Sequence, residues 1–311
     1  MFFFILRRVL IAIPTLLVIA LISFLLMHFA PGSPFSGEKD LPPSVLANIE
    51  AKFHLDKPVS EQFFYYIYNL VHGDFGPSFV YKDFSVTELI GQAWPVSLEL
   101  GLWSFSVAVV LGVLLGTIAA LNQNSRLDYG LMAVAMSGVV IPNFVLAPLL
   151  MLIFAVHLGW LPAGGWNGGD WQNMVLPVIA LALGFVASIA RIIRGSMIEV
   201  MNSPFIRTAR AKGLSRSAIV ARHALRPALM PLIAYLGPAF VGIVTGSMVI
   251  DVFFTTGGLG QHFVNGALNR DYGMVMGITM LIATLTILFN AIVDILYVLI
   301  DPRIRDQGGV L

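Results

Sequence analysis

Six long apolar stretches constrain this chain more than any other feature of its 311 residues. A helix needs about 20 mostly apolar residues to cross the hydrocarbon core of a bilayer. The chain is 58% apolar and only 11% charged, whereas soluble domains are about 45–50% apolar and about 25% charged. We therefore expect an all-α, polytopic membrane protein with six transmembrane helices, at about 9–30, 97–121, 129–158, 174–193, 228–250 and 274–300.

The distribution of basic residues predicts the orientation of the spans, because cytoplasmic loops carry the excess of Lys and Arg. With the N-terminus inside, 13 of the 18 basic residues fall on the cytoplasmic side. Both termini are therefore expected in the cytoplasm. The first span follows Arg7 and Arg8, and its apolar run over residues 9–27 exceeds the roughly 7–15 residues of a cleaved secretory signal. We interpret it as a span that stays in the protein.

The spans divide the chain into two regions. Residues 1–96 hold the first span and a polar segment on the outer side, and residues 97–311 hold a core of five helices. Within the outer segment, apolar side chains recur at helical spacing from Ser60 until Gly73. This pattern predicts a short amphipathic helix at the membrane surface.

Glycines and prolines inside the spans predict how the helices pack and bend. Gly112 and Gly116, and again Gly242 and Gly246, have the spacing that lets two helices approach closely. Prolines such as Pro142 are expected to bend or loosen a helix where neighbouring groups can satisfy the freed carbonyls.

Several kinds of chemistry are excluded by the residues that are missing. The chain has no cysteine, so disulfides, thiolate metal sites and cysteine nucleophiles are ruled out. Six histidines without an H-E-x-x-H pattern give little basis for a metal site, and no G-x-x-x-x-G-K-[ST] phosphate loop occurs. The net charge of +1 gives no support for a nucleic-acid partner. We expect no cofactor and no catalytic residue on this chain.

The longest cytoplasmic loop, about 194–226, has more structure than a passive connection needs. Ser203 and Pro204 are good residues for the N-cap and first position of a helix over 205–212. Gly213 is expected to end this helix as a C-terminal cap, before a second helical run that ends ahead of the next proline. The alternative is a loop that only supplies the positive charge of the inner side. Its basic residues are Arg194, Arg207, Arg210, Lys212, Arg216, Arg222 and Arg226.

The same loop carries a resemblance to a known family. Arg207-Thr208-Ala209-Arg210-Ala211-Lys212-Gly213 is similar to the E-A-A, three residues, Gly motif of ABC-importer permeases, with Arg207 and Thr208 in place of the first two family residues. This form resembles the branch that imports peptides and nickel, and within it the membrane subunit of oligopeptide permeases. Residues 73–78 and 269–272 also look like the corresponding segments of peptide permeases.

The resemblance implies the fold of an ABC type I importer permease in the bacterial inner membrane. It also implies partners: a second, similar permease subunit, two cytoplasmic ATPases that bind ATP and Mg²⁺, and an external peptide-binding protein. The segment 207–213 would then contain the coupling helix that contacts an ATPase. Asp251, where the family usually has Glu, and Asp294, a carboxylate inside the last span, are candidate residues of the translocation pathway.

Two other classes of protein remain as alternatives. A secondary transporter driven by protons or sodium ions keeps ionisable residues near the middle of the membrane, and here Asp294 is the only carboxylate well inside a span. An intramembrane enzyme would need a nucleophile and base at the same depth, and no such pair is recognisable. Within the peptide and nickel branch, the sequence leaves open whether the substrate is an oligopeptide, a dipeptide or nickel.

Overall fold

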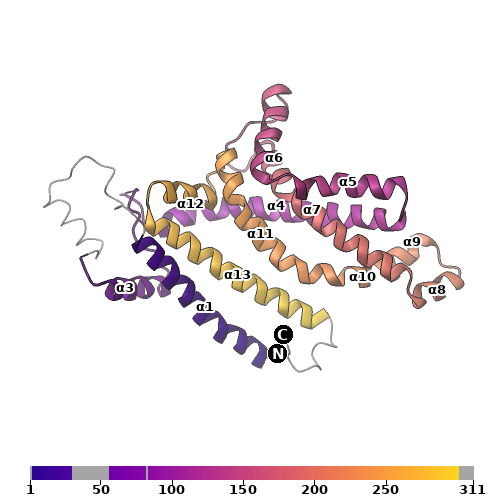
Figure 1. The fold of residues 1–311 in the computed structure, drawn as a ribbon, viewed down its shortest axis with the longest axis horizontal. Coiled ribbons are helices and arrows are strands. Elements are labelled where there is room, and N and C mark those ends of the chain that lie inside the picture. Colours follow the sequence, from indigo (N-terminus) through magenta and orange to yellow (C-terminus); the bar gives the residue numbers. More distant parts are fainter. Residues whose placement is uncertain (1, 30–55, 82, 301–311) are drawn as a thin grey trace. The chain divides into compact units, whose positions relative to one another are not determined.

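The structure is a computed structural model that describes residues 2–29, 56–81 and 83–300. These residues are almost entirely helical and form no β-strand, which confirms the all-α prediction (Figure 1). The helices are α1 (Phe2–His28), α3 (Val59–Val71), α4 (Val86–Leu121), α5 (Arg126–Val140), α6 (Asn143–Leu150), η1 (Met151–His157), α7 (Trp171–Met201), α8 (Pro204–Ala211), α9 (Arg216–Ile219), η2 (Val220–Ala224), α10 (Leu225–Ala228), α11 (Met230–Phe254), α12 (Leu259–Leu268) and α13 (Tyr272–Ile300).

Among the described residues, five helices are long and apolar enough to cross a membrane: α1, α4, α7, α11 and α13. A sixth span results if α5 is counted together with α6 and η1 as one bent pair. Large apolar side chains such as Leu10, Val18 and Leu26 of α1 are exposed. Acyl chains are as apolar as these side chains, so a lipid-facing surface of this kind is stable in a membrane and not in water.

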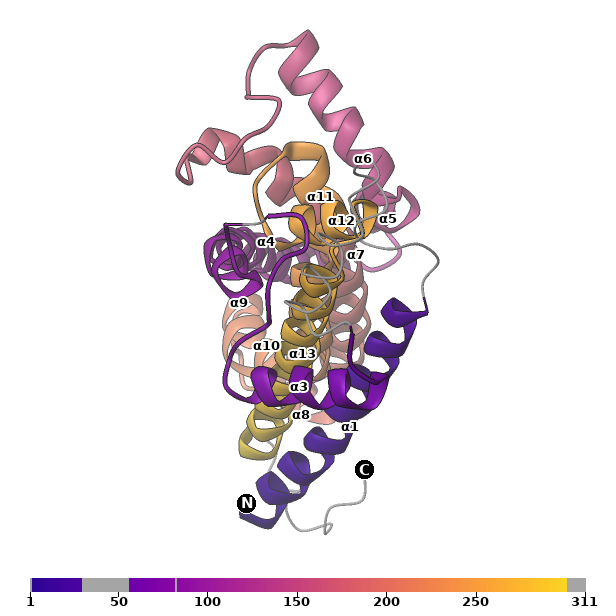
Figure 2. The same cartoon turned by 90° about the vertical axis from the view of Figure 1, so that its left-hand side faces the viewer.

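The chain divides into two compact units. Unit 1 comprises residues 1–97 and 256–288, and unit 2 comprises residues 98–255 and 289–311. In unit 1 the short helix α3 lies across α1, where Phe24 packs against Phe63 with ring centroids 5.3 Å apart (Figure 2). The described part of residues 31–96 therefore contains the amphipathic helix that the sequence predicts, and Gly73, with φ +79°, follows its last turn.

The start of α4 differs from the prediction, because the helix begins at Val86 and not near residue 97. Ser85 and Glu88 form a capping box: the backbone N–H of Ser85 donates to the Glu88 carboxylate at 2.8 Å, and the N–H of Glu88 donates to the Ser85 hydroxyl at 3.2 Å. The extra turns are stabilised by protein contacts within unit 1. Their buried residues pack with α12 and α13 in a core of Val86, Leu89, Ile90, Ala93, Leu259, Met274 and Ile278.

A single helix over 129–158 is also wrong. Residues 126–140 and 143–157 are separate helices that meet at an angle of 105°. Proline has no N–H and disfavours a helical conformation of the preceding residue. Accordingly Ile141 and Pro142 adopt extended conformations, with ψ of 114° and 144°. The two pieces remain long and apolar enough to form one bent span.

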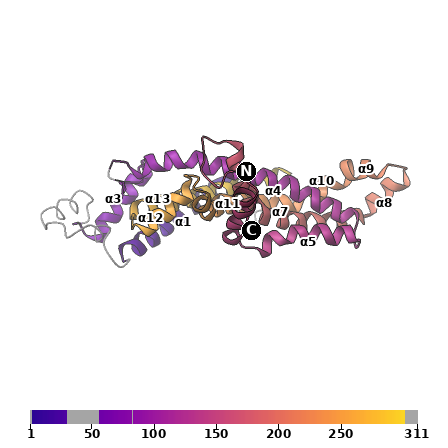
Figure 3. The same cartoon turned by 90° about the horizontal axis from the view of Figure 1, so that it is seen from above.

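In unit 2, α7 packs between α4 and α5 through glycines (Figure 3). A Cβ atom at Gly116 would lie 2.5 Å from the carbonyl oxygen of Ala190, and one at Gly138 would lie 2.5 Å from that of Leu183. Because backbone atoms cannot give way as a flexible side chain does, only glycine permits these approaches. The predicted close packing at Gly112 and Gly116 is confirmed, and Gly138 adds a second crossing on α5.

The crossing at Gly138 predicts that Gly138→Ala destabilises the protein by about 1–3 kcal/mol, as forced overpacking does. The measurement is the midpoint of thermal unfolding in detergent. Gly130→Ala, on the same helix, is the matched control, because a Cβ there meets no atom within 4 Å. That variant should be as stable as the parent or slightly more so, since Ala favours a helix over Gly by about 1 kcal/mol. Equal midpoints for the two variants would contradict the crossing.

Candidate functional site

The helix α8 (Pro204–Ala211) forms the first part of the candidate site, as the sequence predicts. Pro204 occupies its first position, where a missing N–H has no consequence. The expected cap is only partly correct: Ser203 precedes the helix, but its hydroxyl is buried and has no hydrogen-bond partner among the described residues. Ile206 and Ala209 lie on the buried face of α8. They join the main hydrophobic core of unit 2, together with Met197 of α7.

Gly213 ends this segment in the left-handed region, with φ +78°. The N–H of Leu214 donates to the carbonyl of Ala209 at 3.3 Å, and the N–H of Gly213 donates to the carbonyl of Arg210 at 2.9 Å. These two bonds define a Schellman motif, the usual way in which a glycine terminates a helix. A Cβ at Gly213 would meet no atom within 4 Å. The requirement for glycine is therefore conformational and not steric crowding by neighbours.

The second helical run begins where the sequence predicts and ends later. Ser215 caps it by accepting a hydrogen bond from the N–H of Ala218 at 3.4 Å. The run continues through α9, η2 and α10 to Ala228, past the proline that was expected to end it. Pro227 lies in α10, directly after the π-helical turn η2, where the regular i→i−4 bonding of an α-helix is already interrupted.

The segment from Pro204 to Ala228, called the basic segment below, has a basic exposed surface. Between Glu199 and Asp251 the chain has no acidic residue. The solvent-facing side chains include two apolar ones, Phe205 and Leu214, which are 48% and 40% exposed. Exposed aromatic and basic side chains on a helix that is packed on the core are suited to contact an acidic surface of another protein. The exposed basic residues are Arg207, Arg210, Lys212, Arg216, Arg222 and Arg226.

Two arginines of the segment reach the ends of long helices. A guanidinium N–H of Arg216 donates to the carbonyl of Leu121, the last residue of α4. Arg210 makes a longer contact, 3.5 Å, to the carbonyl of Met201, the last residue of α7. Between these contacts lies a cleft of about 610 Å³, lined by the end of α4, the α4–α5 turn, the end of α7 and residues of the basic segment.

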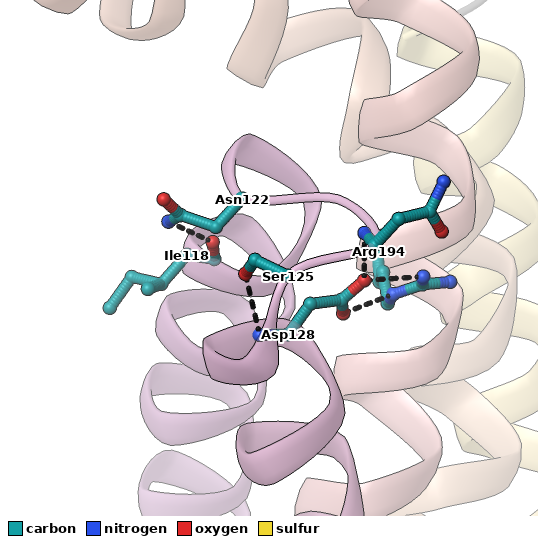
Figure 4. Close-up of polar contacts among 6 residues, drawn as sticks. Ile118, Asn122, Ser125, Asp128 and Arg194 are labelled. Carbon is teal, nitrogen blue, oxygen red and sulfur yellow. Dashed lines mark hydrogen bonds and ion pairs between the residues drawn. The ribbon is translucent and has the colours of Figure 1, made fainter.

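An ion pair between a buried carboxylate and a partly exposed arginine fixes the neighbouring turn, and no pattern in the sequence predicted it. Arg194 of α7 donates to both carboxylate oxygens of Asp128, each at 2.7 Å (Figure 4). Asp128 also accepts the N–H of Asn124 at 2.9 Å, and its own N–H donates to Ser125 at 3.2 Å. The Ser125-x-x-Asp128 spacing is a local signal for a helix start. The partner is 66 residues away and leaves no local signal.

Two motifs of the resemblance meet in unit 1. Asp271 is fully buried and accepts hydrogen bonds from the hydroxyl of Ser78 and from the N–H groups of Phe79 and Met274, the latter two at 3.1 and 3.2 Å. Residues 73–78 and 269–272, far apart in the sequence, are thus joined by one carboxylate. The contact through Asp271 gives a structural reason for the two motifs to occur in the same chain.

The two candidate pathway carboxylates lie in different helices. Asp251 lies in the last turn of α11 and has no exposed surface. Asp294 lies in α13, but its side chain is outside the described residues. Among the described residues, no group of three His, Asp or Glu side chains could hold a metal ion.

The fold and the basic loop together define the class: a multi-pass membrane subunit of an ABC importer. Over residues 112–306 the sequence matches the family described as "binding-protein-dependent transport system inner membrane component", and residues 1–100 match its N-terminal region. The chain belongs to this family and is a multi-pass protein of the inner membrane. The resemblance found at residues 207–213 is therefore confirmed at the level of the family.

Relatives align over nearly the whole chain. The oligopeptide transport system permease protein OppB of Haemophilus influenzae is 64% identical over 302 residues, which are 97% of this chain and 99% of the relative. OppB of Escherichia coli K12 is 62% identical with the same coverage. The dipeptide transport system permease protein DppB of Bacillus subtilis is 45% identical over 291 residues, 94% of each chain.

Solved structures support the fold. Two inward-facing structures of the MetNI methionine ABC transporter superpose with TM-scores of 0.59 and 0.56. Each covers 68% of this chain and 96% of the solved chain, at 20% and 19% sequence identity. The arrangement of helices is thus that of ABC type I importer permeases.

The geometry of the ion pair predicts that Arg194→Gln destabilises the protein more than Asp128→Asn. The first change leaves a carboxylate with 1% of its side chain exposed and without a cation, at a cost of about 3 kcal/mol. The second leaves an arginine whose side chain is 27% exposed and can still reach water, at a cost of about 1 kcal/mol. Thermal unfolding in detergent measures both changes, and the double variant should recover part of the larger loss. Equal losses would contradict the asymmetry.

Proposed function

We propose that this chain is a permease subunit of a binding-protein-dependent ABC transporter that imports oligopeptides. The support is the identity over nearly the full length: 61–64% to OppB proteins, against 45% and 36% to two dipeptide permeases named DppB. A dipeptide substrate is the second candidate, because the relationship to those proteins also extends over most of the chain. Nickel has no comparable support.

The chain is proposed to act in a complex of five parts, with a second permease, two cytoplasmic ATPases and an external binding protein. No phosphate loop occurs in its sequence, so ATP and Mg²⁺ are assigned to the ATPases and no enzymatic step to this chain. Membrane lipid surrounds the spans, and nucleic acid has no role.

The coupling role is inferred from the two faces of α8, of which one is buried and the other is exposed and basic. Ile206 and Ala209 hold the helix on the core of unit 2, while Arg207, Thr208 and Arg210 are exposed. A short helix that is fixed on one side and basic on the other is suited to contact an ATPase and to carry its movement to the spans. We assign this coupling function to the segment Arg207, Thr208, Ala209, Arg210, Ala211, Lys212 and Gly213.

The coupling role requires that the segment faces the cytoplasm. Since the chain has no cysteine, single cysteines report their side without background. Cysteine in place of Ser60 or Asn167 should react with an impermeant thiol reagent from outside, and cysteine in place of Ser217 only from inside. All three side chains are exposed, so accessibility does not limit the reaction. Labelling at position 217 from outside would reverse the orientation and remove the coupling role.

The proposed function is tested by uptake assays and by substitutions at Gly213, where the chain turns after α8. In proteoliposomes that contain the complete complex, ATP should drive uptake of oligopeptides in preference to dipeptides. Gly213→Val should insert normally but lose most uptake, because a residue with a side chain pays roughly 1 kcal/mol or more in the left-handed region and a β-branched one pays more. Gly213→Asn should keep more uptake, since Asn tolerates this conformation.

The matched measurement is the amount of ATPase that copurifies with each variant. Weaker attachment or hydrolysis without uptake in the Val variant supports the coupling role. Full uptake by Gly213→Val at normal expression refutes it. A proton gradient that drives uptake without ATP would instead favour a secondary transporter.

A further inference from the structure

The end of α4 is held by a residue of the basic segment that lies just beyond the coupling segment 207–213. Arg216, the first residue of α9, donates a guanidinium hydrogen bond to the carbonyl of Leu121. The last carbonyls of a helix have no partner within the helix and form the negative end of its dipole. A guanidinium is therefore a favourable partner here in both hydrogen bonding and charge. The contact joins residues that are 95 positions apart in the chain.

No acidic side chain competes for this guanidinium within the cleft. The cleft is lined by apolar residues, by polar uncharged ones and by two arginines, without Asp or Glu. Arg210 reaches the end of α7 on the other side of the same cleft. The basic segment thus meets the ends of two spanning helices through hydrogen bonds to their backbone carbonyls.

The turn that follows Leu121 is fixed at its other end. Asn124 has a left-handed conformation, φ +62°, and its N–H donates to the Asp128 carboxylate. Asp128 in turn accepts hydrogen bonds from Nε and Nη2 of Arg194 on α7 (Figure 4). The backbone of the α4–α5 turn therefore connects two sets of directional bonds, that of Arg216 to Leu121 and that of Asn124 and Arg194 to Asp128.

We propose that Arg216 and the Asp128–Arg194 pair are positioning residues that make the coupling segment and the adjoining ends of α4, α5 and α7 move as one body. The proposal rests on the proposed function, since it concerns how that segment transmits ATPase movement. Packing of Ile206 and Ala209 holds the segment near the core. Apolar contact is non-directional, whereas these hydrogen bonds specify one orientation.

The test compares Arg216→Gln, Arg216→Lys and the control Arg126→Gln in the reconstituted complex. Arg126, the first residue of α5, is exposed and lies outside the basic segment, and in the described part of the chain its side chain forms no hydrogen bond or ion pair. The readout is the number of ATP molecules hydrolysed per peptide imported, with the amount of assembled complex measured separately. A purely stabilising residue would lower assembly and leave this ratio unchanged.

Arg216→Gln should raise the ratio about tenfold, which corresponds to about 1.4 kcal/mol of lost coupling. Arg216→Lys, which keeps a charged donor, should restore most of the coupling, and Arg126→Gln should leave the ratio unchanged. An unchanged ratio in Arg216→Gln, or an equal rise in Arg126→Gln, overturns the proposal. If the unsubstituted complex shows no hydrolysis that depends on peptide, the proposed function fails instead.

A covalent link tests movement as one body directly. In the double variant Asn122→Cys and Arg216→Cys, a short bismaleimide replaces the lost hydrogen bond by a tether. The unlinked protein should have the high ratio of Arg216→Gln, and linking should return the ratio toward that of the parent. Linking that blocks uptake would show that the segment and the end of α4 separate during transport, and would overturn the proposal.

Discussion

The hydrocarbon core of a membrane offers no water to a backbone N–H or carbonyl, and the structure follows from this constraint. Each spanning segment must satisfy its own polar groups, and the helix is the form in which a single chain segment does so. The ends of the helices remain the places where donors and acceptors lack partners. In this protein those ends carry the informative contacts: the capping box at Ser85, the Schellman motif at Gly213 and the arginine on the carbonyl of Leu121.

Between the helices, a second consequence of the same solvent governs packing. Apolar side chains gain little by leaving lipid for protein, so close contact between helices depends on small residues and on polar links. Gly116 and Gly138 bring α4 and α5 against the backbone of α7, and the Asp128–Arg194 pair joins α5 to α7 near the basic segment. The basic segment in turn bonds to the ends of α4 and α7. A junction held by such directional contacts is consistent with the proposed role of a subunit that receives its energy from another chain.

The helices depart from the apolar pattern at two places, the start of α4 and Pro142. Apolar length predicted the spans, but it placed the start of α4 about ten residues late. Those first turns are held by contacts with α12 and α13 in unit 1, and hydropathy does not register protein contacts. The signal that marks the true start, Ser85 with Glu88 three positions later, is a local one and was available. The conformational preference of proline correctly predicts that the helix is interrupted near Pro142. The angle of 105° between the two pieces is set by the way the chain packs.

Apolar periodicity, the distribution of charge and the turn residues were enough to predict much of this protein. They predicted an all-helical membrane protein, a short helix at 204–211 and a helix end at Gly213. Each depends on interactions within a few positions of the chain, or on the free energy of moving a segment from water into lipid. The partner of Asp128, the contact of Arg216 with the end of α4 and the meeting of Ser78 with Asp271 were decided only by the tertiary structure. They join residues between 66 and 193 positions apart. Such a pairing exists only once the intervening helices have packed, because no local rule relates two side chains that the fold brings together.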